Sequence, residues 1–283
     1  MFKGSFLFYY VFGGGYCIIL GDTKIFISRG RKMEINKSYH IGLSESYGAR
    51  YAILPGDPGR VETIAMYLDN PKFVCQQREY TTWIGELLGE KVLVMSTGMG
   101  GPSTAIGVEE LTNLGVDTFI RVGTCGAMQT DIVGGDVVIA TGAIRMEGTT
   151  KEYVPIEFPA VPNLDVTNAL VDAAKDIGVT YHAGVVQCKD SFYGQHNPDR
   201  MPIGYELKNK WEAWIKAGCL ASEMESAALF IVSSFLRVRA GAVFHCVWNQ
   251  EREKEGLYNP TVTDTKKAIE TAVGAIKNLI KAQ

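Results

Sequence analysis

The sequence predicts an α/β fold, a single-domain mixed central sheet flanked by helices. Short apolar segments typical of strands alternate with longer segments whose apolar residues recur at helical spacing. Several strand-like segments end in glycine-containing turns, where α/β sheets commonly form ligand sites. The chain of 283 residues is 46% hydrophobic and 21% charged, as expected for a globular protein able to bury a core. Strands separated by helices favour a parallel or mixed sheet.

The first 32 residues differ from the rest and are interpreted as an atypical N-terminal extension, consistent with an over-called reading frame. Residues 5–20 are apolar and aromatic around three glycines. A bilayer span needs about 20 apolar residues, and no signal-peptidase site follows the run. We therefore expect Met33 to be the functional start of one domain over residues 33–283. A cytoplasmic protein without membrane contact is expected, and a membrane tether through residues 5–20 is the alternative.

The first part of that domain is expected to contain four strands and two helices. An apolar strand over residues 51–54 ends in a Pro-Gly turn, and a helical segment follows with its apolar residues on one face. A hairpin is predicted from residues 81–88 and 91–97 across Gly89-Glu90. A glycine-rich turn then leads to a helix opened by Pro102, and a strand follows over residues 117–122.

The second part of the domain continues the alternation of strands and helices. No internal sequence repeat and no linker is found in it. The final helix carries a clear apolar stripe at helical spacing. The expected strands are 136–146, 182–189 and 239–248, and the expected helices are 164–176, 205–217, 224–236 and 264–282. A polar turn around Ser222 is expected between the second and the third of these helices.

Charge and composition exclude several kinds of partner. The net charge is −3, so there is no global basic field to hold nucleic acid or an anionic membrane. Neither the six cysteines nor the four histidines show metal-ligand or disulfide-framework spacing. We expect a reducing compartment and no transition metal. Any bound anion must then be held by a few placed residues.

Two glycine-containing turns are candidate anion sites with simpler alternatives. Gly56 to Arg60 follows a strand, and its backbone N–H groups and arginine suit a phosphate-like anion. A tight turn with a surface arginine is the alternative. Residues 98–103 nearly match the dinucleotide fingerprint G-x-G-x-x-G, with Ser103 in place of the third glycine. Asp117 lies at a suitable distance but begins its strand, which leaves a dehydrogenase as a weaker interpretation.

Three further segments carry candidate ligand groups. Arg121 lies late in an apolar strand, where burial is costly unless an anion or a carboxylate meets the guanidinium. Residues 190–195 offer an aromatic pair and Gln195, which could stack on and read a base, or form an ordinary core edge. Glu223 and Glu225 precede an apolar helix. They could complement its dipole, or chelate a vicinal diol.

Taken in order, these motifs resemble the uridine phosphorylases, within the wider family of hexameric nucleoside phosphorylases. The resemblance runs from about residue 40 to the C-terminus. It rests on several short motifs: His40–Leu43, Pro55–Arg60, Arg78–Trp83, Ser96–Ser103, Arg121–Ala127, Phe158–Ala160, Phe192–Gln195 and Glu223–Ser226.

The resemblance implies a nucleoside phosphorylase-like fold and a set of roles. It implies Arg121, Glu225 and Gln195 as the catalytic residues. Phosphate would be bound by Gly56, Arg60, Arg121 and Thr124, with Arg78 from a neighbouring subunit. The ribose would be bound by Thr124, Met224 and Glu225, with His40 of the neighbour at the 5′-hydroxyl. The base would contact Phe192, Gln195, Arg200 and Trp248.

The resemblance also implies an assembly and a co-substrate. Relatives form hexamers built as trimers of dimers with shared sites, so a homo-oligomer is expected. Inorganic phosphate is a co-substrate and no cofactor is required. A monovalent cation near Glu79 and Ser103 is a further implication.

A pyrimidine substrate is predicted from an absence. Purine-cleaving relatives place an aspartate after the last strand, whereas this sequence has Asn249, which cannot act as a general acid. Two departures affect base recognition. Asn197 replaces an arginine usual in relatives, with Arg200 as the nearest substitute, and Trp248 is bulkier than expected.

The predicted function is phosphorolysis of uridine, with deoxyuridine and thymidine as further candidates. A purine nucleoside phosphorylase, or a nucleosidase of the same fold, is the alternative within the family. A nucleosidase would have no use for three phosphate-directed arginines. A non-catalytic nucleoside-binding protein and a nicotinamide-dependent dehydrogenase are the alternatives from other classes.

Overall fold

The computed structural model describes residues 8–12, 15–20, 23–28 and 37–283. A three-stranded antiparallel sheet contains β1 (Phe8–Phe12), β2 (Gly15–Leu20) and β3 (Thr23–Ser28). A nine-stranded mixed sheet contains β4 (Tyr51–Pro55), β5 (Asp69–Gln77), β6 (Tyr80–Leu87), β7 (Glu90–Met95), β8 (Thr118–Ala127), β9 (Val137–Met146), β10 (Tyr181–Lys189), β11 (Ala221–Glu223) and β12 (Arg239–Asn249).

The nine-stranded sheet closes partly on itself. Its order is β11-β10-β9-β12-β8-β4-β7-β6-β5, and β11 also pairs with the end of β8. Five strands, β11, β10, β9, β12 and β8, therefore form a closed ring from which the other four extend. Strands β4, β8 and β12 are parallel neighbours, so their C-terminal ends lie at one edge. The closure by β11 brings the end of β10 toward the same region.

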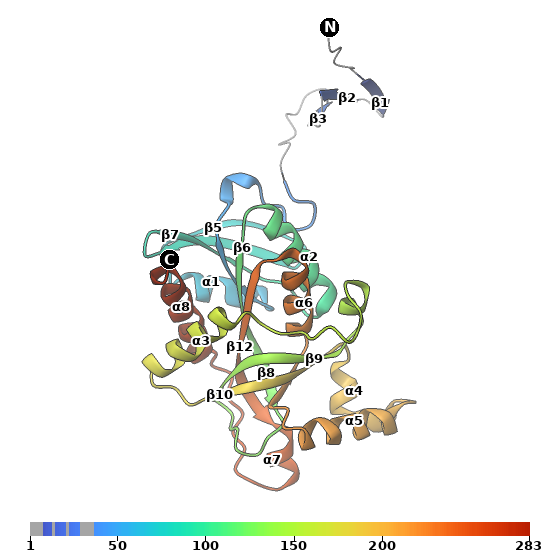
Figure 1. Cartoon of the computed structure of the whole chain (residues 1–283), viewed down its shortest axis with the longest axis vertical. Helices are drawn as coiled ribbons and strands as arrows, with labels where there is room; N and C mark the ends of the chain where they lie inside the picture. Colours follow the sequence, from blue (N-terminus) through green and yellow to red (C-terminus); the bar gives the residue numbers. More distant parts are fainter. Residues whose placement is uncertain (1–7, 13–14, 21–22, 29–36) are drawn as a thin grey trace.

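Helices cover both faces of the sheet. On one side α2 (Gly101–Asn113) packs against α6 (Ser226–Leu236), and on the other α3 (Leu164–Asp176) packs against α8 (Lys266–Lys281), as Figure 1 shows. Each helix pair contributes to its own large apolar cluster. Because both faces are covered, β4 is buried along its whole length and reads as a continuous apolar run.

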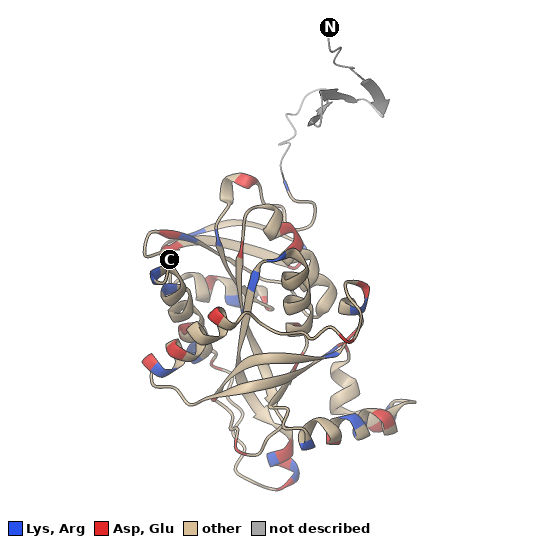
Figure 2. Ribbon diagram, viewed as in Figure 1, with Lys and Arg blue, Asp and Glu red and all other residues tan. Residues whose placement is uncertain are grey.

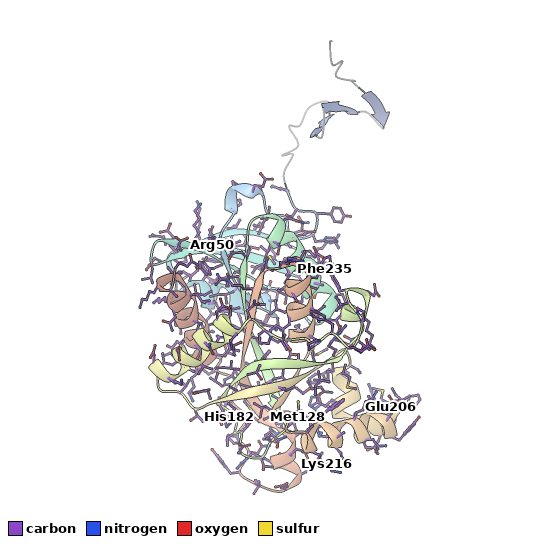
Figure 3. All side chains as sticks on the ribbon, viewed as in Figure 1. Arg50, Met128, His182, Glu206, Lys216 and Phe235 are labelled. Carbon is purple, nitrogen blue, oxygen red and sulfur yellow. The ribbon has the colours of Figure 1, made fainter. Side chains whose placement is uncertain are left out.

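Three short helices and the longer helix α5 complete the fold. These are α1 (Val61–Ala65), α4 (Phe192–His196), α5 (Gly204–Lys216) and α7 (Gln250–Lys254). A small cluster of Met128, Trp211 and Cys219 packs α5 against the end of β8 (Figure 3). Figure 2 shows basic and acidic residues interspersed along α5 and α7, as expected of solvated faces.

The predicted α/β class with a central sheet flanked by helices is confirmed, and three local predictions were wrong. The edge strand β5 has no predicted counterpart, because it is half-exposed and rich in polar residues. The hairpin turn lies at Leu88-Gly89, both with positive φ, instead of Gly89-Glu90. The segment around Ser222, predicted as a polar turn, forms β11, and the following helix begins at Ser226 instead of 224.

The proposed boundary at residue 32 stays a prediction. Met33 lies outside the described residues, and the strands between residues 8 and 28 form a sheet of their own. Among the helices that the structure describes, none is long and apolar enough to cross a bilayer.

Candidate functional site

A cavity of about 800 Å³ lies where the ends of β4, β8, β10 and β12 meet β11 and α4. Turns after strands and the short α4 supply its walls, so its polar groups come from segments far apart in the sequence. Nine of the residues predicted for the site line it: Gly56, Arg60, Arg121, Thr124, Phe192, Gln195, Met224, Glu225 and Trp248.

A buried ion pair joins two of the predicted catalytic residues. Nη2 of Arg121 lies 2.5 Å from Oε2 of Glu225, and both side chains are almost fully buried. The structural salt bridge that was the alternative to anion binding is therefore present. However, Nε of Arg121 is buried without a hydrogen-bond partner among the described residues. An unsatisfied guanidinium donor in a residue that lines a cavity favours an anionic ligand.

The carboxylate of Glu225 is fixed at both oxygens. Oε1 accepts a hydrogen bond from the backbone N–H of Gly100 at 2.7 Å, and Oε2 is held by Arg121. A carboxylate oxygen can accept more than one hydrogen bond, so each retains capacity for a ligand hydroxyl. Glu225 is thus oriented to accept from two neighbouring hydroxyl groups of a sugar.

The glycine-rich turn before α2 holds this carboxylate through a backbone hydrogen bond. Gly100 adopts φ of 95° and directs its N–H toward Glu225. Asp117, which would have to bind a ribose in the dehydrogenase interpretation, instead pairs with Arg50 and Arg239. Figure 3 labels Arg50 at the opposite end of the molecule from Met128, which follows β8. The dehydrogenase interpretation is therefore rejected.

The other candidate phosphate residues lie in the turn after β4. Among the described residues the guanidinium of Arg60 forms one ion pair, with Asp57 at 3.8 Å. Burial lowers the pKa of Arg60, while Asp57 and Glu225 oppose that change and the charge of Arg121 adds to it. The side chain of Asp57 is itself engaged, since it accepts a hydrogen bond from Gly59 N. Arg60 can therefore turn its charge toward an anion in the cavity.

Gly56 leaves little room for a side chain, because its backbone lies against Arg121. A Cβ atom at this position would lie 3.2 Å from Nη2 of Arg121 and 3.1 Å from the carbonyl oxygen of Gly98. We predict that Gly56→Ala displaces the guanidinium and raises the KM for phosphate by roughly tenfold, about 1.4 kcal/mol. Gly148→Ala provides a control, because Gly148 has a negative φ and the nearest atom to its added Cβ would lie 3.7 Å away. An unchanged phosphate KM in Gly56→Ala would contradict this role.

Aromatic rings form the opposite wall. The ring of His196 lies 4.3 Å from that of Phe192 and 6.3 Å from that of Trp248, measured between centroids. This arrangement supplies flat apolar surfaces on which a base can stack. His196 was not predicted from the sequence, because a lone histidine in a polar loop gives no specific signal.

Two further charged residues line the cavity: Lys189, which was not predicted as a ligand, and Glu223, one of the two glutamates considered for a vicinal diol. Nζ of Lys189 donates to Ser222 Oγ at 2.6 Å. Burial, together with the charge of Glu225, raises the pKa of Glu223, whose carboxylate accepts from the backbone N–H groups of Glu225 and Ser226. Glu223 therefore caps α6. The signal available in the sequence for Lys189 was a charged residue at the end of an apolar strand.

Three predicted residues do not line the cavity within this subunit. His40 and Arg78 lie together on either side of Tyr39, whose ring contacts His40 and lies 6.0 Å from the Arg78 guanidinium carbon. Nδ1 of His40 is held at 2.5 Å by Glu110. Arg200 lies over the ring of Tyr193 at 5.2 Å and does not line the cavity, so its contact with the base stays a prediction.

The side chain of Asn249 has a structural role, which weakens the argument from a missing acid. It is fully buried, donates to the carbonyl oxygens of Gln129 and Ile132, and caps α7 by accepting from two backbone N–H groups. Asn249 does not line the cavity. Its identity alone therefore does not decide between pyrimidine and purine.

The residues predicted near a monovalent cation lie on either side of Gly98. A Cβ atom on Gly98 would approach both the Glu79 side chain and Ser103 Oγ. Oxygen donors of this kind suit a hard cation. Among the described residues there is no cluster of three or more histidine, cysteine or acidic side chains that could hold a metal ion.

Comparison with known proteins identifies the family to which this chain is similar. Residues 50–282 match the phosphorylase superfamily. A uridine phosphorylase of Treponema pallidum is 60% identical over 242 residues, which cover 86% of this chain and 94% of the relative. A uridine phosphorylase of Escherichia coli is 41% identical over 86% of this chain and 98% of the relative. A guanosine phosphorylase of Halorubrum lacusprofundi is 42% identical over 73% of this chain and 81% of the relative.

Proposed function

The chain belongs to the phosphorylase superfamily, and from this premise we propose that it cleaves uridine with inorganic phosphate to give uracil and ribose 1-phosphate. The similarity to uridine phosphorylases over most of the chain supports the substrate. The observation that carries the chemistry is the Arg121–Glu225 pair at the cavity wall. In this pair, a side chain suited to bind phosphate lies directly beside one suited to bind a diol.

The reaction follows from the charges that it creates. The N1–C1′ bond breaks with its electron pair on the base, and a phosphate oxygen forms the new bond to C1′. Positive charge develops on the sugar, which the adjacent phosphate dianion stabilises. Arg60 and Arg121 concentrate and orient that phosphate, while Glu225 holds the ribose over it. Gln195 and the aromatic wall bind the base, and no covalent enzyme intermediate is needed.

A shared site accounts for the position of His40 and Arg78. Both lie outside the cavity of their own subunit, and they lie close together through Tyr39. In a hexamer built as a trimer of dimers, this pair completes a neighbour's site, with Arg78 at the phosphate and His40 at the 5′-hydroxyl. Glu110 holds Nδ1 of His40, which leaves Nε2 for that hydroxyl.

We predict that His40→Ala raises the KM for uridine by roughly tenfold, about 1.4 kcal/mol, because one hydrogen bond to the 5′-hydroxyl is lost. The KM for 5′-deoxyuridine is expected to stay unchanged, since that substrate lacks the hydroxyl. Steady-state kinetics on both nucleosides measure the difference. Equal losses on the two substrates would contradict the assignment of His40.

The remaining parts of the proposal concern surroundings and ions. The five described cysteines from Cys75 to Cys246 are unpaired, which supports a cytoplasmic location. Phosphate is a co-substrate and no cofactor takes part. A monovalent cation beside Glu79 and Ser103 would be structural, because its oxygen ligands would order the turn around Gly98.

A second candidate substrate class is purine nucleosides. The guanosine phosphorylase among the relatives and the structural role of Asn249 favour keeping it. Product analysis tests the proposed reaction against both alternatives. Incubation of uridine with phosphate should give uracil by chromatography and ribose 1-phosphate by phosphorus-31 NMR. Free ribose in place of the phosphate ester would indicate a nucleosidase and would contradict the proposal.

A further inference from the structure

A lysine lies at the wall of the cavity where the base would bind. Lys189 is the last residue of β10, and its side chain is 5% exposed. It lines the main cavity together with Gln195 and Ser222. It also lines an adjoining cavity of about 400 Å³. Lys189 therefore belongs to the wall between two cavities.

The ammonium group of Lys189 is only partly paired. Its Nζ donates to Ser222 Oγ at 2.6 Å, and no carboxylate lies within ion-pair distance among the described residues. An ammonium has three N–H donors, so two remain without an acceptor in the part of the chain that the structure describes. A buried charge in this condition is costly unless a ligand supplies the missing acceptors.

Burial and the neighbouring carboxylates act in opposite directions on the pKa of Lys189. Burial lowers the pKa of Lys189, while Glu223 and Glu225 favour its protonated form. On the facing helix α4, burial and the charge of Lys189 both lower the pKa of His196. Both effects disfavour protonation of His196, whose ring offers an aromatic surface beside the lysine.

The hydroxyl of Ser222 connects this lysine to the amide predicted to read the base. Ser222 Oγ lies 2.7 Å from Gln187 Oε1 and 2.8 Å from Gln195 Oε1. Because a hydroxyl has one hydrogen, it can donate to only one of the two amides. Donation to Gln187 leaves Gln195 able to bind the base beside Lys189.

We propose that Lys189 donates a hydrogen bond to a carbonyl oxygen of the bound pyrimidine and stabilises the negative charge of the departing base. This inference rests on the proposed phosphorolysis of uridine. As the N1–C1′ bond breaks, its electron pair passes into the ring and is shared by the carbonyl oxygens. A cation held at one of them lowers the energy of the transition state more than that of bound uridine. The lysine keeps its protons throughout.

The experiment compares two leaving groups in Lys189→Met, which replaces the side chain by an uncharged one of similar volume. The two substrates are uridine and 5-fluorouridine, whose fluorine already stabilises the departing anion. For uridine, kcat/KM is expected to fall roughly 10- to 100-fold. The loss for 5-fluorouridine is expected to be clearly smaller, because less stabilisation is required of the protein. Lys189→Arg, which retains a cation, should recover part of the uridine activity.

Equal losses on the two substrates would overturn the proposal, because a merely structural role lowers both rates alike. Full uridine activity in Lys189→Met would overturn it as well. Thermal unfolding and the KM for phosphate check that the variant is folded with its phosphate site intact. If Lys189→Met does not fold, the same comparison is made with Lys189→Gln. A wild-type protein that releases no uracil from uridine with phosphate would instead refute the proposed function.

Discussion

Replacement of Arg121 by alanine is expected to reduce kcat/KM for phosphorolysis of uridine roughly 10³-fold, about 4 kcal/mol of transition-state stabilisation. The guanidinium is buried, it has an unsatisfied Nε donor, and it lies in the cavity with Arg60. A charge-assisted contact to phosphate in such a site is worth more than one in water. Initial rates of uracil release at saturating and limiting phosphate measure the loss.

The interpretation needs controls because Arg121 also neutralises buried Glu225. Loss of one partner of a buried ion pair destabilises a protein by itself. The double variant Arg121→Ala with Glu225→Gln removes that unpaired charge, so it should regain thermal stability without regaining activity. Arg50→Ala removes an exposed ion pair at the far end of β8 and should leave the rate unchanged. Near-normal turnover in Arg121→Ala would contradict the phosphate assignment.

Replacement of Glu225 by glutamine is expected to lower kcat/KM for uridine roughly 100-fold, about 2.7 kcal/mol. The amide keeps one acceptor oxygen but loses the charge and the second acceptor that the sugar hydroxyls require. With 2′-deoxyuridine, which offers one hydroxyl fewer to this residue, the loss should be smaller. The ratio of the two kcat/KM values is therefore the measurement.

Glu223→Gln provides a matched control two residues away. Glu223 caps α6 through backbone N–H groups, so its replacement should lower the melting temperature. The ratio between uridine and 2′-deoxyuridine should stay at its wild-type value. A ratio that shifts in Glu223→Gln but not in Glu225→Gln would reverse the roles assigned to the two glutamates.

The parts of the site that could be predicted from the sequence are those encoded locally at strand ends. Gly56 follows an apolar strand and Arg121 lies within one, and a glycine or a charged residue in these places is unusual enough to notice. The class of fold was predictable for the same reason, since buried parallel strands read as apolar runs. The edge strand β5 was not, because an exposed strand carries no such run.

Other parts of the site depend on long-range geometry that no local pattern reveals. Lys189 reaches the cavity only because β11 pairs with both β10 and β8 and so closes the sheet. Asn249 ends the last strand, at the position where an acid is expected in a purine-cleaving enzyme. Its side chain instead caps α7 and donates to backbone carbonyl groups. The turn after α4 places Arg200 over the ring of Tyr193, and Arg200 does not line the cavity.

The central claim is that this cavity catalyses attack of phosphate on uridine. The most direct test is the initial rate of uracil release from uridine with and without inorganic phosphate, with inosine and guanosine measured in parallel. The account predicts that uridine is cleaved only when phosphate is present and that it is much preferred to the two purine nucleosides. Release of uracil at the same rate without phosphate, or faster cleavage of a purine nucleoside, would contradict it.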